Sequence, residues 1–231
     1  MFKKHNALNR SVTSALGVAA ALLAAPAAVW ASGQYVVEDA DLIEPRSMVL
    51  ELWYSDFEEA NFVEGTVRGE GPFQLTGVIG MPRFGREVLE LQGKWAVLDR
   101  AAYGYGISLF GAVIYDTDTD EVEEGALLIP VTLEPVPDRM LLHVNVGATH
   151  VRDGSETDLF WGVGTEVALF GPVEAVAEVF GNDSDDPTVQ AGLRVMLLND
   201  QVSFDVSYYE ELEDGGASGW AAGFGIEALR F

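Results

Sequence analysis

The carboxyl-terminal stretch, residues 219–231, constrains the fold more than any other part of the sequence. Its apolar side chains recur at every second position, and the chain stops on an aromatic residue. This period of two is typical of a β-strand with one apolar face. A last strand of this kind has a simple role if it pairs with the first strand and closes a barrel. We therefore predict a barrel-closure and membrane-insertion signal that consists of Trp220, Phe224, Leu229 and Phe231.

One acidic residue in this stretch does not fit simple alternation. Glu227 lies four residues before Phe231 and shares its face if the strand is regular. A terminal aromatic residue that faces lipid would then bring a carboxylate with it. A β-bulge near Glu227, which adds one residue to the strand, would turn the carboxylate inward. The sequence leaves both arrangements open.

The amino-terminal segment has the parts of a secretory signal peptide. Three basic residues precede an apolar run over residues 15–29, and small residues before Ser32 suit a cleavage site. An uncleaved membrane anchor is the alternative, but the run is shorter than the roughly 20 residues that a spanning helix needs. We therefore divide the chain into a signal peptide (1–31), an acidic periplasmic or lumenal leader (32–46) and an outer-membrane β-barrel (47–231).

Strand-like alternation recurs along the whole mature chain, at the short spacing of an all-β meander. Eleven stretches are clear: 48–55, 73–80, 88–98, 103–115, 127–133, 142–149, 159–169, 173–179, 189–197, 202–208 and 219–231. A weaker stretch at 61–68 makes the number even, which places both chain ends on one side of the membrane. The predicted fold is all-β, an antiparallel transmembrane β-barrel of about 12 strands, with 10 as the fallback.

The lengths of the connections indicate an orientation. The longer ones, such as residues 116–125 and 210–218, are acidic, and the shorter ones, such as 171–172 and 199–200, are tight turns. Long loops outside and short turns in the periplasm are the habit of outer-membrane barrels. Both chain ends are therefore expected at the periplasmic side.

The composition excludes several classes of function. The chain has no cysteine, which rules out disulfides and thiolate chemistry, and it has 13 basic and 37 acidic residues. Three of the basic residues belong to the signal segment, so the mature chain has a net charge of −27. Such a surface repels nucleic acid and attracts cations. Solubility of the exposed loops explains the same charge without any selectivity.

Ionisable and polar residues concentrate on the face of the strands that we expect to point inward. The lumen-facing candidates are Glu51, Glu90, Lys94, His143, Asn145, Glu166, Glu174, Glu178, Arg194 and Asp205. They have three interpretations: cross-lumen pairs that fill the barrel, a water-filled pathway lined by acids, and a catalytic or metal site. In the last of these, His143 would act with Glu174 or Glu178.

Known enzyme patterns do not fit the sequence. A barrel phospholipase needs a nucleophilic serine two positions after a strand histidine, and Asn145 and Arg152 stand at those positions after His143 and His150. The glycine-rich pieces lack the strand-to-helix context of a phosphate-binding loop. We therefore expect no enzyme, no catalytic residue and no cofactor.

Two acidic loops are candidates for weak divalent cation binding. Their carboxylates are Asp116, Asp118, Asp120, Asp183 and Asp185. The first loop is not an EF-hand, because Glu121 replaces the glycine of the sixth position and Leu127 replaces the glutamate of the twelfth. These loops either bridge divalent cations to lipopolysaccharide phosphates or are simply solvated.

Several short motifs resemble a family of outer-membrane barrels labelled "putative MetA-pathway of phenol degradation". They are the leader 37–40 with Glu44 and Pro45, and the stretches 143–147, 177–181, 190–194 and 228–231. The opening departs from the family pattern at Val37, Glu38 and Arg46. The resemblance implies a transporter-like barrel for small compounds, including aromatic ones, and it implies no catalytic residues.

Taken together, the sequence predicts a barrel in the cell outer membrane, exported through a cleaved signal peptide. The expected function is a narrow channel or uptake route for small molecules, including hydrophobic or aromatic ones. A plugged barrel with a structural or cation-bridging role is the alternative, and an outer-membrane hydrolase is a third reading. The expected partners are outer-membrane lipid and lipopolysaccharide, the barrel-assembly machinery, divalent cations and an unidentified solute, with no nucleic acid.

Overall fold

The twelve predicted strands are all present in the structure. The computed structural model describes residues 34–85, 87–117, 119–152 and 156–231, so the predicted signal peptide lies outside the described residues. The strands are β1 (Ser47–Ser55), β2 (Ala60–Arg68), β3 (Phe73–Pro82), β4 (Val88–Leu98), β5 (Tyr105–Asp116), β6 (Glu121–Val136), β7 (Met140–Val151), β8 (Glu156–Phe170), β9 (Val173–Gly181), β10 (Thr188–Leu197), β11 (Val202–Glu211) and β12 (Ser218–Arg230).

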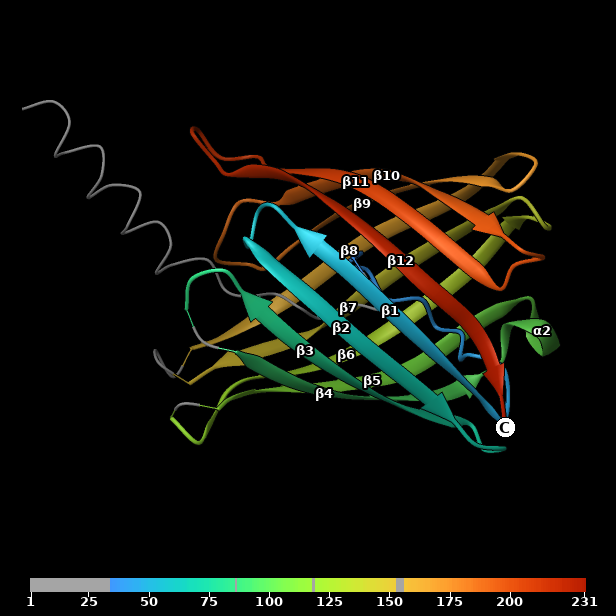
Figure 1. The fold of residues 1–231 in the computed structure, drawn as a ribbon, viewed down its shortest axis with the longest axis horizontal. Coiled ribbons are helices and arrows are strands. Elements are labelled where there is room, and N and C mark those ends of the chain that lie inside the picture. Colours follow the sequence, from blue (N-terminus) through green and yellow to red (C-terminus); the bar gives the residue numbers. More distant parts are fainter. Residues whose placement is uncertain (1–33, 86, 118, 153–155) are drawn as a thin grey trace, which may run out of the picture.

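Each strand pairs antiparallel with its neighbours in sequence, and β12 pairs with β1 to close the barrel (Figure 1). The weak stretch is a full strand, β2, which pairs with β1 from Ser47↔Arg68 to Ser55↔Ala60. The prediction of an antiparallel barrel with twelve strands is therefore confirmed. The start of β1 and the C-terminus lie at the same end, which we call the C-terminal end (Figure 1). We call the opposite end of the barrel the loop end.

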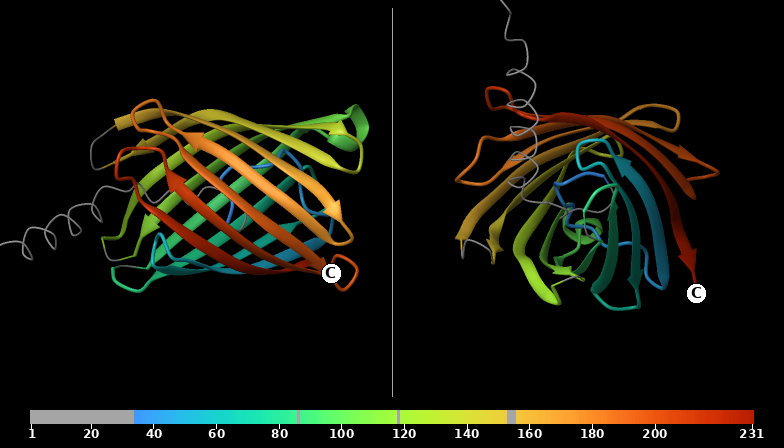
Figure 2. Two further views of the ribbon diagram at one scale, coloured as in Figure 1. Left: turned by 90° about the horizontal axis from the view of Figure 1, so that it is seen from above. Right: turned by 60° about the vertical axis from the view of Figure 1, so that its left-hand side comes forward.

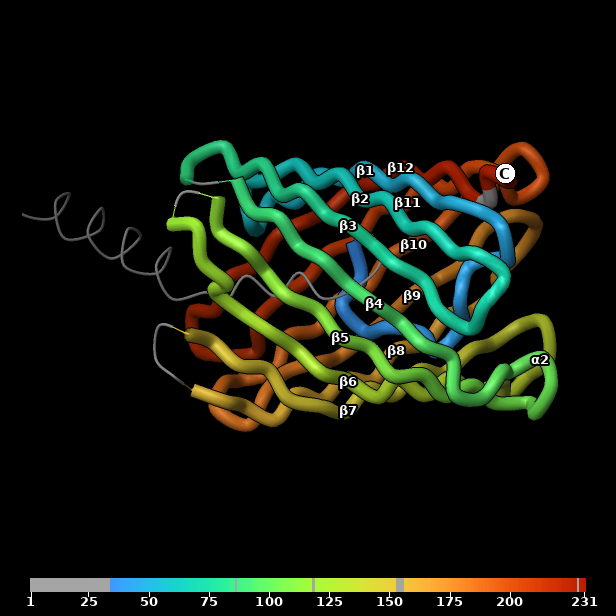
Figure 3. The backbone as a smooth tube through the Cα atoms, turned by 90° about the horizontal axis from the view of Figure 1, so that it is seen from below, coloured from blue at the N-terminus to red at the C-terminus, as the bar shows by residue number. Residues whose placement is uncertain are grey.

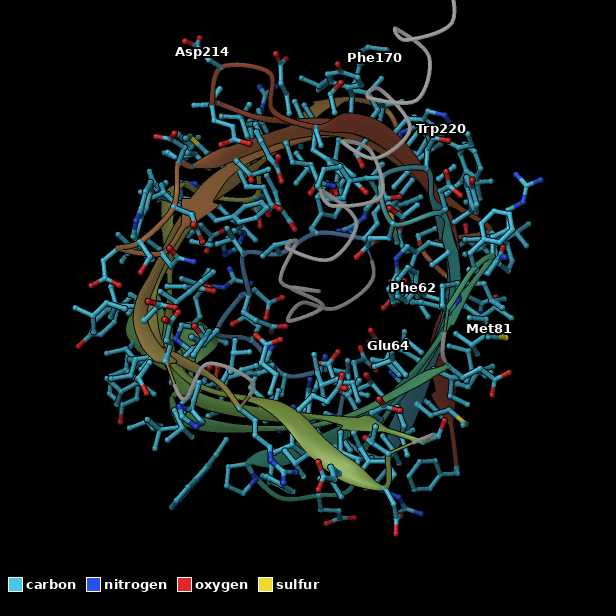
Figure 4. All side chains as sticks on the ribbon, turned by 90° about the vertical axis from the view of Figure 1, so that its left-hand side faces the viewer. Phe62, Glu64, Met81, Phe170, Asp214 and Trp220 are labelled. Carbon is cyan, nitrogen blue, oxygen red and sulfur yellow. The ribbon has the colours of Figure 1, made fainter. Side chains whose placement is uncertain are left out.

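The barrel wall has an apolar outer face and a mixed inner face, because side chains alternate along every strand. Apolar side chains that stay exposed on the outer face include Leu52, Leu75, Leu91, Trp95, Leu109, Ile129, Val146, Leu193, Phe204 and Phe224. Figure 4 looks along the barrel, with Glu64 on the inside of the wall and Trp220 on the outside. An apolar outer belt of this kind is the surface that a lipid bilayer requires.

The β-bulge that the sequence left open is present where β12 meets β1. Met48 pairs with Leu229 and Leu50 pairs with Ile226, so Glu227 and Ala228 together stand opposite Val49. This extra residue restores the alternation. Glu227 accepts a hydrogen bond from Ser203 Oγ at 3.1 Å inside the barrel, while Leu229 remains exposed.

Two local expectations were wrong. The predicted strand 103–115 begins only at Tyr105, because a short helix, α2 (Arg100–Tyr103), precedes it. Asp99 caps this helix by accepting from Ala101 N, and Gly104 ends it at a φ of 77°, a left-handed conformation that glycine adopts without strain. The predicted loop 116–125 is shorter, because β6 already begins at Glu121. Here strand pairing with β5 extends into an acidic segment, with Glu121 opposite Asp116.

The leader, residues 34–46, lies inside the barrel. The blue segment in Figures 2 and 3 runs within the lumen and joins β1 at the C-terminal end. Four of its side chains, those of Tyr35, Val37, Glu38 and Ala40, are almost fully buried. Among the described residues, no helix is long and apolar enough to cross a membrane.

Candidate functional site in the barrel lumen

Polar side chains of the wall bind the backbone of the leader at successive points. Asn145 accepts from Glu38 N at 2.8 Å and donates to Glu38 O at 2.7 Å. The Glu178 carboxylate accepts from two consecutive amides, those of Val36 at 2.8 Å and Val37 at 3.0 Å. These contacts hold the leader extended, since only an extended segment presents its amides to side chains on neighbouring strands.

Further wall residues continue this pattern on both sides. Their contacts are Gln190 Nε2 with Gln34 O at 2.8 Å, Thr132 Oγ1 with Ala40 N at 2.8 Å, Gln74 Oε1 with Ile43 N at 3.0 Å and Arg68 Nη1 with Ile43 O at 2.6 Å. Together with the Lys94–Glu38 ion pair, these contacts join the leader to residues of β2, β3, β4, β6, β7, β9 and β10. The wall thus supplies hydrogen-bond partners to many of the leader's peptide groups, as buried backbone groups require.

Ion pairs tie the acidic side chains of the leader to wall cations. Lys94 Nζ lies 2.5 Å from Glu38 Oε2 and 3.0 Å from Asp39 Oδ1. The side chain of Lys94 is only 4% exposed, and that of Glu38 is 1% exposed. Arg100 lies 2.8 Å from Asp41 and 3.0 Å from Glu134 of the wall. Buried charges of opposite sign are costly to separate, because each then lacks a counter-charge away from water.

Glycines on the inner wall make room for the leader. A Cβ atom at Gly164 would lie 3.2 Å from Cβ of Val37, and one at Gly162 would lie 2.9 Å from its Cγ2. A Cβ atom at Gly106 would lie 3.2 Å from Cβ of Ala40. These distances are tighter than most Cβ contacts, so a bulky side chain at these positions would push the leader away, and the absence of a side chain here favours docking.

The ion pairs of the leader shift the pKa of two of its carboxyl groups in opposite directions. Burial favours the neutral form of Asp39, but Lys94 outweighs it and lowers the pKa of that carboxyl. Burial and the neighbouring Asp39 raise the pKa of Asp41, although Arg100 acts against them. Asp39 is thus held ionised by the docked arrangement.

A second charged group lies beside the start of the leader. Arg194 Nε donates to Asp205 Oδ1 at 2.8 Å, and Arg194 Nη1 lies 3.5 Å from Glu166 Oε1. The guanidinium also lies 5.5 Å from the ring centroid of Tyr35, within cation–π range. A cavity of about 10 Å³, lined by Gln34, Glu51, Arg194 and Asp205 among others, adjoins this group.

The structure places the ten lumen-facing candidates in different roles. Lys94, Asn145 and Glu178 bind the leader directly, and Arg194, Asp205 and Glu166 form the group beside Tyr35. Glu174 stands opposite Arg194 in the sheet, and Glu51 stands opposite Glu64. Glu90 accepts from Gln92 Nε2 at 2.9 Å.

His143 does not meet the acids that a catalytic reading would need. Its Nδ1 lies 3.0 Å from Thr132 Oγ1, the hydroxyl that also accepts from Ala40 N. Glu178, one of its two candidate partners, is engaged with the leader amides. The histidine therefore positions a residue of the leader-binding wall.

Sequence reasoning missed the neutral residues of the site. Gln74, Thr132 and Gln190 bind the leader, and so do the cations Arg68 and Arg100. The signal that could have found the first three is alternation, since each occupies an inward position of its strand. Attention to ionisable groups alone passed over them.

The residues of the insertion signal are all exposed at the barrel surface. Trp220 is 45% exposed, Phe224 41%, Leu229 41% and Phe231 62%. Trp220 lies at the loop end of β12, and its ring packs against Tyr54 with centroids 5.3 Å apart. This exposure along β12 suits contact with lipid.

No group of three potential metal ligands converges in the part of the chain that the structure describes. Asp116 is buried and accepts from Thr119 N at 3.3 Å, and Asp120 accepts from the Tyr115 hydroxyl. Asp183 accepts from Leu159 N, and Asp185 from Asn182 Nδ2. The remaining candidate, Asp118, lies outside the described residues.

Apolar side chains gather on the inner wall as well, which is unusual for a water-filled pore. One cluster consists of Phe110, Ala112, Ile114, Ala126, Leu128 and Phe160, with Val36 of the leader packed against it. Another consists of Trp53, Ala60, Phe62 and Val78, in which the Trp53 and Phe62 rings stack at 4.9 Å. Both lie mainly on the halves of the strands nearer the loop end.

Solved structures share this fold at very low sequence identity. The chain is similar to the KdgM porin, with a TM-score of 0.61 and 9% identity over 78% of this chain and 98% of that one. It is also similar to the NanC porin, with a TM-score of 0.56 and 6% identity over 79% and 99%. A third is the outer membrane protein Omp33 of Acinetobacter baumannii, with a TM-score of 0.51 and 8% identity over 79% and 98%.

These similarities support the fold, a closed antiparallel β-barrel. No curated protein matches the sequence. A family profile, in contrast, matches most of the chain, from residue 19 to residue 227. The chain therefore belongs to the family described as "Uncharacterised conserved protein UCP029691".

Proposed function

We propose that the protein is an outer-membrane channel for small solutes, with its C-terminal end in the periplasm and its lumen occupied by the leader in this structure. The observation that carries the proposal is that the leader, and not the side chains of the wall alone, fills the lumen. Wall side chains fill the interior of an eight-stranded barrel, whereas barrels of 16–18 strands leave an aqueous channel. In this twelve-stranded barrel the leader occupies the middle of the lumen, and its only covalent connection to the wall is through β1.

Removal of the leader from the lumen would open a pathway with an acidic wall. Glu51, Glu64, Glu90 and Glu178 all project inward. Lys94 would lose both of its carboxylate partners, since both come from the leader. Together with the net charge of −27 for the mature chain, this wall supports a preference for cations.

A reversible lock of the leader tests the channel. The chain has no cysteine, and the Cβ position at Gly164 lies 3.2 Å from Cβ of Val37, close to the roughly 3.5–4.5 Å of a disulfide. In the mature chain carrying Val37→Cys and Gly164→Cys, we expect a planar bilayer to stay silent under oxidant and to show discrete, cation-selective steps under reductant. The Val37→Cys single variant is the control and should not respond to oxidant.

Two outcomes would contradict this proposal. Steps of equal size and frequency in the oxidised and reduced states would show that the leader does not control the pathway. Silence in both states, with the barrel shown to be inserted by its heat-modifiable gel shift, would favour a permanently plugged barrel.

The solute class follows from the apolar inner clusters, and we infer solutes with an apolar or aromatic part. Phe110 and Phe160 lie on the inner wall, where a porin for water-soluble solutes would carry polar groups. This inference agrees with the resemblance to the phenol-degradation barrels, which remains a hypothesis. We expect reversal potentials to favour benzyltrimethylammonium over tetraethylammonium, and Phe110→Ser with Phe160→Ser to remove the preference. Phe204→Leu on the outer face is the control.

The plugged barrel with a structural or cation-bridging role is the second candidate. The dense contacts of the leader favour it, because a segment bound at this many points also stiffens the wall. It predicts that substitution of Asp183 and Asp185 weakens binding to lipopolysaccharide in the presence of calcium, while conductance is absent from every leader variant. Isothermal titration with lipopolysaccharide micelles would measure the first effect.

A further inference from the structure

Three properties of the inner wall together describe a peptide-binding site. The wall binds backbone groups of the leader, it supplies cations for its carboxylates, and it leaves space for particular side chains. We propose that the barrel lumen contains a binding site for an extended acidic peptide, and that the leader is its tethered occupant. The proposal concerns recognition of the segment and does not depend on whether the barrel conducts.

The backbone contacts are those of a site that recognises peptide groups in general. Asn145 uses both the oxygen and the nitrogen of its amide on one residue, Glu38, as a neighbouring strand would. Thr132, Gln74 and Gln190 each bind one further backbone group. None of these contacts depends on the side chains of the leader, so they supply affinity for an extended chain without selecting its sequence.

The selection for acidic side chains comes from Lys94 and Arg100. Lys94 is almost fully buried and pairs with Glu38 and Asp39. Arg100 has a wall partner, Glu134, and adds Asp41 from the leader. Lys94 therefore gains its neutralising charge from whatever peptide is bound, and a peptide with amides in place of these carboxylates would leave the cation buried without a counter-charge.

The selection for side-chain size comes from the glycines. The Cβ positions of Gly162 and Gly164 lie within 2.9–3.2 Å of atoms of Val37, and that of Gly106 lies 3.2 Å from Cβ of Ala40. Tyr35 lies over Gly192, where an added Cβ would lie 2.6 Å from its hydroxyl and 2.5 Å from Val206 O of the neighbouring strand, so both the wall and the leader require this glycine. The wall is thus shaped to an aromatic residue, a valine and an alanine at fixed spacings along the peptide.

Binding of a free peptide to a barrel with a weakened leader tests this inference. The barrel is the full mature chain with Glu38→Gln, Asp39→Asn and Asp41→Asn, substitutions that leave the wall unchanged. The probe is a synthetic peptide of residues 34–45 with a fluorophore at its carboxyl end, and fluorescence anisotropy in detergent gives the Kd. The comparison peptide carries the same three substitutions as the leader of the variant barrel.

We expect the natural peptide to bind this barrel at least tenfold more tightly than the substituted peptide. The unaltered mature chain should bind it at least tenfold more weakly than the variant does, because its own leader occupies the site. Adding both Lys94→Met and Arg100→Gln to the variant should remove the preference between the two peptides, whereas adding Thr149→Val, on the same inner wall, should preserve it. Equal affinity of the variant for the two peptides, or a preference that survives the loss of both Lys94 and Arg100, would overturn the inference.

Conductance of the same variant separates this inference from the proposed function. Conductance steps that the natural peptide blocks and the substituted peptide does not block would support both the peptide site and the channel. Preferential peptide binding to a silent barrel would support the peptide site and contradict the channel. Steps that neither peptide blocks, together with equal binding, would support the channel and contradict the site.

Discussion

Asn145 and Glu38 lie 107 residues apart in the sequence and form a paired hydrogen bond in the centre of the barrel. The Asn145 side chain is fully buried, and its amide satisfies both the N–H and the C=O of Glu38. This pair joins a segment that precedes the barrel to a strand in the middle of it. One side chain thus makes two of the hydrogen bonds that hold the leader.

We therefore expect Asn145→Leu to weaken docking of the leader by about 1–3 kcal/mol, the usual cost of leaving buried polar groups without partners. Leucine keeps the branched shape of the side chain with a somewhat larger volume, so the wall should still assemble. Hydrogen exchange of the Val36–Ala40 amides measures the effect, with faster exchange expected. Thr149→Val on the same strand is the control. Unchanged protection in Asn145→Leu would contradict a central role for this pair.

The glycine positions predict a steric release of the leader. In Gly164→Val the added side chain overlaps Val37, whose Cβ lies 3.2 Å from the Cβ position. We expect more frequent conductance steps and loss of amide protection in the leader, and we expect Val37→Gly in the same chain to restore both. Gly77→Ala, where an added Cβ meets nothing within 4 Å, is the matched control. Failure of Val37→Gly to compensate would point to damage in the wall instead.

Acid should release the leader through Asp39. Its pKa is lowered in the docked state because Lys94, with a further contribution from His143, outweighs burial. A carboxyl with a lowered pKa stabilises the docked state above its undocked pKa of roughly 3.9, and this stability is lost as the pH falls through the docked pKa. Release is thus expected below about pH 4.

Asp41 acts in the opposite sense, because burial and Asp39 raise its pKa, and its protonation does not favour release. Asp39→Asn isolates the contribution of Asp39. The variant should show weaker docking at pH 7 and a smaller change between pH 7 and pH 3, measured as conductance or as tryptic cleavage of the leader. An acid response of full size in this variant would assign the effect to another group.

The apolar outer belt predicts that the cost of a charged substitution depends on its depth in the membrane. Ile129 and Val122 lie on the outer face of β6 and are 44% and 48% exposed. Ile129 stands in the middle of the strand and Val122 at its loop end. We expect Ile129→Arg to destabilise the barrel by about 2–4 kcal/mol in lipid vesicles, and Val122→Arg by about 0–1 kcal/mol. Denaturant titration followed by tryptophan fluorescence checks both, and equal effects would contradict this placement of the belt.

The sequence determined the wall of the barrel. Alternation along each strand depends only on the local backbone, which sends successive side chains to opposite faces, so residues 88–98 or 202–208 can be assigned without knowing their neighbours. The need for an even number of strands then settled the weak stretch that became β2. Even the bulge at Glu227 was a recognised option, because the conflict between Glu227 and Phe231 is local.

The position of the leader was decided only by the tertiary structure. The sequence left it in the periplasm or in the lumen, because its contacts are single hydrogen bonds and ion pairs to residues between 25 and 156 positions away. No period in the sequence encodes such partners. They come together only after twelve strands have closed and brought Lys94, Asn145 and Glu178 around the leader. Closure of the barrel is a cooperative, long-range event, and it alone turns an acidic, irregular segment into a bound one.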